Sequence, residues 1–67
     1  MRGTIVGLER DGLDYVLLVR REDSVRNGLA MPKESVYAIL ARKGNFIGKE
    51  IEYSEDGLTF LEDLKAA

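Results

Sequence analysis

The sequence has no histidine and no cysteine, the two residue types that carry much of the acid–base, metal and thiol chemistry of proteins. Without them the chain lacks the ligand set of a zinc finger, a thiol nucleophile, a histidine base and any disulfide framework. Tryptophan is also absent, and proline occurs only once. These absences argue against most enzymatic and metal-dependent functions, and the lack of cysteine leaves the redox compartment open.

Length and composition predict one small β-rich domain, residues 1–67. The chain is 45% apolar and 33% charged, which suits a soluble protein with a modest core. A domain of this size buries only about 60% of the surface of its unfolded chain, so its stability is marginal. Because neither a disulfide nor a zinc site is available, a second subunit is the remaining way to bury more surface. The composition therefore leaves both a monomer and a homo-oligomer open.

We expect a cytoplasmic protein that does not bind membranes. Apolar runs such as residues 15–19 are far shorter than the ~20 residues that span a bilayer. The start of the chain also differs from a signal peptide, because the apolar run 5–8 is short and three charged residues follow it at once.

Residues 3–21 have the pattern of a β-hairpin. Two runs rich in β-forming residues, 4–8 and 15–19, flank an Asp11-Gly12 step. Glycine accepts a positive φ at little cost, which predicts such a backbone at Gly12. The second run is apolar at both alternating sets of positions, as in a strand that is buried on both faces. We therefore predict that residues 15–19 form the central strand.

Residues 22–43 predict a loop followed by a helix. The polar stretch 22–31 indicates a loop or turn, with a short strand at 29–31. In 32–43, Pro32 stands at a helix start and two basic residues precede Gly44, as helix ends require. The segment also contains good β-formers, so a strand there remains the alternative.

Residues 46–63 predict a second hairpin, with alternating polar and apolar residues before a Glu55-Asp56-Gly57 turn in which Gly57 has a positive φ. The tail, 62–67, frays or adds a helical turn. The resulting order, ββ-(β)-α-ββ, is mostly β (small α+β). It fits a five-stranded OB-type barrel with one short helix near 32–43, or an SH3-like barrel if that segment is not helical.

Candidate catalytic groups are few. The carboxylate pairs at 11/14, 50/52, 55/56 and 62/63 lie in expected turns or on a solvated strand face, where both members of each pair stay ionised. Residues 44–50 differ from a phosphate-binding loop in the glycine spacing and in Glu50, which stands where serine or threonine is required. No segment has the spacing of a calcium loop. We expect no enzymatic activity, no cofactor and no metal.

The distribution of charge suggests a binding role. Residues 20–43 hold six basic against three acidic residues, whereas residues 44–67 hold two basic against six acidic ones. A basic segment can bind phosphates locally, although a solvated basic face is the alternative. The candidate nucleic-acid-binding residues are Arg20, Arg21, Arg26, Lys33, Arg42 and Lys43. Among the aromatic residues we expect core positions, with Tyr37 and Phe46 as the exceptions that could stack on bases.

Several short segments are similar to the AbrB/MazE swapped-hairpin family of DNA-binding regulators. They are Leu29-Ala30-Met31-Pro32-Lys33-Glu34, Leu40, Gly44, Glu50-Ile51-Glu52 and Asp56-Gly57-Leu58. The resemblance covers residues 17–63. It implies an intertwined dimer in which Arg20, Arg21 and Arg26 approach DNA.

Two function classes follow. The first is a small non-enzymatic binding module, an adaptor for another protein or for nucleic acid. The second is a dimeric DNA-binding regulator of the kind that the resemblance implies. The first predicts a hairpin at 3–21 that closes within one chain, and the second predicts strand exchange between two chains.

Overall fold

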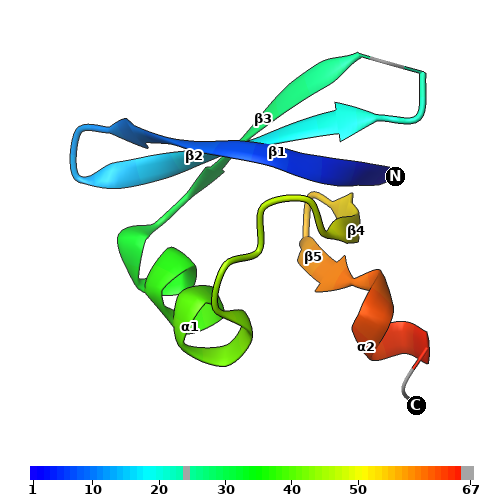
Figure 1. Ribbon diagram of the computed structural model, residues 1–67. Coiled ribbons are helices and arrows are strands. Elements are labelled where there is room, and N and C mark those ends of the chain that lie inside the picture. The colour runs from blue at the N-terminus through cyan, green and yellow to red at the C-terminus, as the bar shows by residue number, and fades with distance from the viewer. Residues whose placement is uncertain (24, 66–67) are drawn as a thin grey trace.

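Five antiparallel strands form one sheet in the computed structural model, which describes residues 1–23 and 25–65 (Figure 1). The strand order is β3-β2-β1-β4-β5. The elements are β1 (Arg2–Asp11), β2 (Asp14–Arg21), β3 (Arg26–Met31), α1 (Lys33–Lys43), β4 (Glu50–Ser54), β5 (Gly57–Phe60) and α2 (Leu61–Lys65). The mostly β class with one short helix before the last hairpin is thus confirmed. None of the helices in 1–23 and 25–65 is long and apolar enough to cross a membrane.

The sheet is open, because β3 and β5 lie at its two edges and do not pair with each other. The closed barrel expected from the element order is therefore not formed by these strands alone. β1, β2 and β3 make a continuous layer, and α1 with the β4–β5 hairpin lies on one side of it (Figure 1). This arrangement leaves the other face of the layer without a covering element from the described part of the chain.

Both predicted turn glycines have a positive φ. Gly12 has a φ of 61° between β1 and β2, and Gly57 has a φ of 141° where β5 begins. The first hairpin pairs Asp11 with Asp14, so only two residues form its loop. An alanine at Gly12 or Gly57 would be strained, because residues with a side chain rarely adopt such backbone angles. Glycine thus fixes where both hairpins reverse.

The helix expected at 32–43 is present as α1. Pro32 precedes its first turn without any side-chain cap, and Glu34 lies in that turn. The basic residues Arg42 and Lys43 lie in the last turn, where they complement the helix dipole. The chain leaves the helix at Gly44, which has a φ of 68° and whose N–H donates to the carbonyl of Leu40 at 2.9 Å. The signals at the two ends therefore placed this helix correctly.

One face of the sheet packs on α1 and carries the core. The buried side chains come from every strand except β3, from α1 and from the loop before β4, and they are Ile5, Leu17, Val19, Val36, Ile39, Phe46, Ile51, Tyr53 and Phe60. Leu8, Leu29, Met31 and Leu58 are half-buried against this cluster. Phe46 is 2% exposed, so the prediction that it stays open to solvent is wrong, whereas Tyr37 is 54% exposed as expected.

The predictions for the central strand and for residues 22–31 need correction. The middle strand is β1, which pairs with β2 on one side and with β4 on the other. β2 is an inner strand, but only Leu17 and Val19 are buried, while Val16 and Leu18 on its other face are half-buried. β3 begins at Arg26, three residues before the expected strand, because pairing with β2 extends from Arg20↔Arg26 to Tyr15↔Met31.

We predict that Leu17→Ala destabilises the protein by about 2–5 kcal/mol, because Leu17 is 1% exposed and its removal leaves a cavity in the core. Urea unfolding followed by circular dichroism measures the change. The matched control is Leu13→Ala in the first turn, where the side chain is 76% exposed and the expected change is within about 0.5 kcal/mol. Equal stability of the two variants would contradict the assignment of β2 to the core.

Candidate functional site

The register of the sheet brings together two of the six basic candidates. Arg20 on β2 pairs with Arg26 on β3, and both are exposed on the face turned away from the core. Arg21 points to the opposite face, and its Nη2 lies 3.0 Å from Oδ2 of Asp23. Of the two adjacent arginines, only Arg20 therefore lies on the same face as Arg26.

The three remaining basic candidates belong to α1, on the other side of the sheet. Lys33 and Arg42 lie at opposite ends of this helix, so they are about 13 Å apart along its axis. Lys43 is engaged in ion pairs, and its side chain is only 11% exposed. Its Nζ also lies 5.1 Å from the centre of the Phe60 ring. The six residues thus do not converge on one surface.

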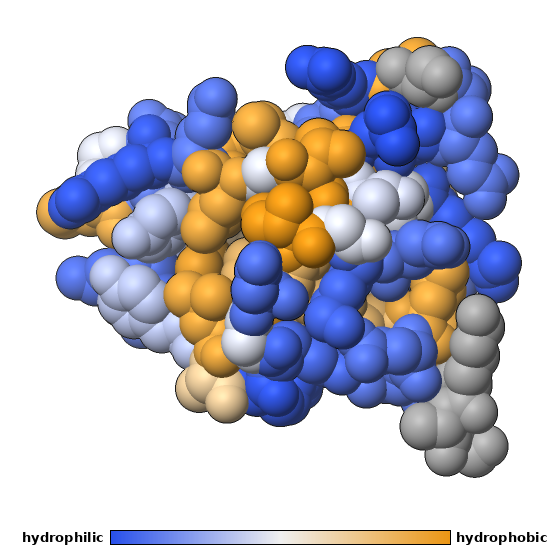
Figure 2. All heavy atoms as spheres, viewed as in Figure 1, coloured by the Kyte–Doolittle hydropathy of each residue, from blue (hydrophilic) through white to orange (hydrophobic). Residues whose placement is uncertain are grey.

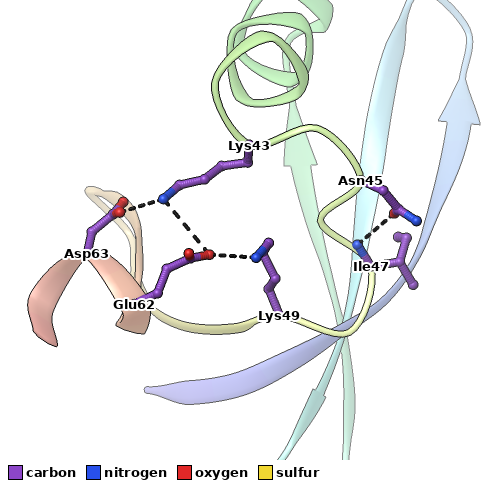
Figure 3. A network of polar contacts seen from close by, with 6 residues as sticks. All are labelled: Lys43, Asn45, Ile47, Lys49, Glu62 and Asp63. Atoms are coloured by element: carbon purple, nitrogen blue, oxygen red, sulfur yellow. Dashed lines mark hydrogen bonds and ion pairs between the residues drawn. The ribbon is translucent and has the colours of Figure 1, made fainter. Parts of the chain in front are cut away.

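Lys43 belongs to a polar network that ties α1 and the following loop to α2 (Figure 3). Its Nζ bonds to Asp63 and lies 3.9 Å from Oε1 of Glu62. The same oxygen accepts from Nζ of Lys49 at 2.8 Å. The bond from Lys49 lowers the pKa of Glu62, and the charge of Lys43 acts in the same direction. This network holds α2 in place. Its two basic residues, Lys43 and Lys49, therefore have a structural role.

A hollow of about 410 Å³ lies between the two edges of the sheet. β3 and the start of α1 line one side of it, and the turn from β4 to β5 lines the other. Its lining residues are Gly28, Leu29, Ala30, Met31, Pro32, Ser35, Ser54, Glu55, Gly57 and Leu58. We call this hollow the edge groove. Both edge strands, β3 and β5, contribute residues to its lining.

The floor of the edge groove is apolar and its borders are acidic. Leu29, Met31 and Leu58 are half-buried there and continue into the core. Beyond these side chains, Nδ2 of Asn27 on β3 donates to Oη of Tyr53 on β4 at 2.9 Å and links the two sides. The one charged residue that lines the groove in the described part of the chain is Glu55. The groove can therefore hold an extended chain with apolar side chains.

An adjoining hollow of about 500 Å³ shares Ser54, Gly57 and Leu58 with the edge groove. Its charged side chains are those of Glu52 and Asp56. The two hollows together run along β5, and the exposed carboxylates of Glu55 and Asp56 border them, whereas Glu52 lies 3.9 Å from Nε of Arg2 and the ammonium of Met1 lies in the second hollow. The sequence analysis missed this site, because only the fold brings residues 28–35 next to 54–58. The alternation of Leu29 and Met31 before Pro32 was the available signal.

Comparison with known proteins found no matching family model, no matching curated protein and no matching solved structure.

We predict that Glu62→Gln reduces stability at neutral pH and has less effect as the solution becomes acidic. The folded state lowers the pKa of Glu62, so its contribution is present above the ordinary value of 4.5 and is lost as pH falls through the folded-state pKa. Thermal melting of both proteins from pH 7 to pH 3 tests this. Glu22→Gln, which removes an exposed carboxylate without an ion pair in the described part of the chain, is the control. A difference between wild type and Glu62→Gln that grows on acidification would contradict the assigned role.

Proposed function

We propose that this protein is a small non-enzymatic binding module that receives an extended segment of another protein in the edge groove. The observation that carries the proposal is that both edge strands of the sheet contribute residues to one hollow with an apolar floor. A segment that paired with β3, with β5 or with both would complete the barrel that the element order suggests. The function is therefore capture of an extended chain by strand addition.

The physical basis is the unsatisfied backbone of the edge strands. β3 has six residues and β5 has four, and each presents one row of N–H and C=O groups that the sheet does not use. Addition of a strand supplies partners for these groups, while pockets for alternate side chains supply specificity. Here Leu29, Met31 and Leu58 offer the apolar contacts for every second side chain of the bound segment.

The charge around the groove selects the other side chains of the segment. Glu55 lines the groove, and Glu52 and Asp56 line the adjoining hollow. Arg2 lies 3.9 Å from Glu52 and the ammonium of Met1 lines the adjoining hollow, so the attraction for lysine or arginine comes from Glu55 and Asp56. We therefore expect a segment in which apolar and basic residues alternate.

Nucleic-acid binding is the second candidate, favoured by the exposed pair Arg20 and Arg26. Three arginines, Arg2, Arg20 and Arg21, line one hollow, but Glu22 and Glu50 line the same hollow and reduce its attraction for phosphate. A swapped-hairpin regulator remains a weaker proposal, because each of the five strands pairs with a neighbour from the same chain.

We predict that the heptapeptide Lys-Val-Lys-Val-Lys-Val-Lys binds the edge groove. Titration into ¹⁵N-labelled protein should shift amide signals of β3 and β5 saturably. A peptide with the central valine replaced by proline loses a backbone donor and should bind more weakly. Glu55→Lys should weaken binding about two- to fivefold, as expected for an exposed charge pair.

Glu22→Lys is the matched control, because it makes the same charge change at a residue that does not line the groove. Its affinity for the peptide should equal that of the wild type. A duplex oligonucleotide at low salt is titrated in parallel. Shifts at Arg20 and Arg26 with the oligonucleotide, and none at β3 and β5 with the peptide, would overturn the proposal in favour of nucleic-acid binding.

A further inference from the structure

The face of β1–β2–β3 that turns away from the core is apolar in its middle. Register places Val16 beside Ala30, and Leu18 between Gly7 and Gly28. Val6, at the irregularity where the β1–β2 register shifts, is 39% exposed. Figure 2, in the same view as Figure 1, shows hydrophobic residues across the middle of the molecule with hydrophilic residues around them, and the residues of the outer face itself are given by the register. An antiparallel sheet that is solvated on one face normally carries polar side chains there.

Glycines flatten this face. A Cβ atom at Gly7 would lie 3.2 Å from Cδ1 of Leu18, and one at Gly28 would lie 2.9 Å from Cγ1 of Val16. The two aliphatic side chains therefore lie across neighbouring glycines and do not stand up from the sheet. A flat apolar sheet face is the kind of surface that packs against another sheet.

The two ends of the face carry opposite charge. Arg20 and Arg26 lie together at one end. At the other end Glu9 pairs with Val16, and Asp11 and Asp14 lie at the hairpin turn. The ends are about 20 Å apart along β2, from residue 14 to residue 20. Glu50 on β4 pairs with Thr4 on β1, and Thr4 in turn pairs with Arg20 on β2. Glu50 therefore borders the basic end.

We propose that this face docks on the same face of a second copy of the chain. The twofold axis lies in the interface and runs across the strands, so that the acidic end of each copy covers the basic end of the other. An isologous interface needs one surface that is complementary to itself, and a face with an apolar middle and opposite charges at its ends meets this need. The result is a two-sheet sandwich in which Val16 and Leu18 are buried, as the doubly apolar pattern of β2 predicts.

This inference is independent of the proposed function, because it uses the outer face of the sheet, whereas the edge groove opens between β3 and the β4–β5 turn. Gly28 and Ala30 border both surfaces. Peptide binding in the groove and self-association can therefore be measured separately, and either can fail without the other.

Sedimentation velocity from micromolar to millimolar concentration tests the dimer. We expect the mass to rise from that of one chain, 7.5 kDa, to twice that value. Val6→Glu should raise the dissociation constant at least about tenfold, because it buries a charge in the interface. The matched control is Leu40→Glu on α1, where the side chain is 42% exposed on the other side of the sheet. Circular dichroism confirms that each variant is folded.

A charge exchange tests whether attraction between opposite charges holds the two faces together. The variant Arg20→Glu with Arg26→Glu makes both ends of the face acidic, and the variant Glu9→Arg with Asp14→Arg makes both ends basic. Each alone should be monomeric, and their mixture should form a heterodimer. Wild-type protein that remains monomeric at millimolar concentration, or a dimer that Val6→Glu leaves unchanged, would overturn the proposal. Two variants that fail to associate when mixed would overturn the proposed attraction between the charged ends of the two faces.

Discussion

The rest of the structure depends on the backbone pairing of β1, the strand that joins the two halves of the molecule. On one side β1 pairs with β2, and on the other it pairs with β4. The N–H of Ile5 donates to the carbonyl of Lys49 at 3.0 Å, and the N–H of Gly48 donates to the carbonyl of Ile5 at 2.8 Å. Ile5 itself is fully buried. Without β1, the pair β2–β3 and the hairpin β4–β5 would have no shared sheet.

The central position of β1 also explains why two surfaces remain unfinished. A five-stranded sheet built outward from β1 ends at β3 and β5, and the chain has no further strand in the described residues to join them. α1 covers one face and leaves the other open. A domain of this size cannot complete both surfaces by itself, because it has too few residues to bury. The two proposed associations, with a peptide at the edge and with a second copy on the face, would each cover one of these surfaces.

Much of the fold follows from local signals in the sequence. The turns at Gly12 and Gly57 and the end of α1 at Gly44 were predictable because each needs a backbone angle that glycine adopts easily. The extent of β3 was not predictable, because Arg26-Asn27-Gly28 has the composition of a turn. Pairing with β2 overrides that preference, and Gly28 is required there by the close approach of Val16.

The candidate site was less predictable than the fold. The distribution of charge along the chain suggested a basic patch. Lys43, however, forms ion pairs with α2, and its partner Asp63 lies twenty positions away in the sequence. The edge groove combines residues 28–35 with 54–58, and no local pattern encodes that proximity. The apolar outer face was visible as the double alternation of residues 15–19. That this face is uncovered became clear only from the position of α1 on the other side of the sheet.

Native-state hydrogen exchange of single amides tests the central role of β1 most directly. The amides of Ile5 and Gly48 close the junction between the two halves, and that of Leu17 lies in the buried part of β2. If β1 holds the sheet together, the amides of Ile5 and Gly48 exchange only through global unfolding, with the same free energy and denaturant dependence as Leu17. Exchange of Ile5 and Gly48 at a clearly lower free energy than Leu17 would show that the C-terminal half detaches while the first three strands persist, and would contradict the account.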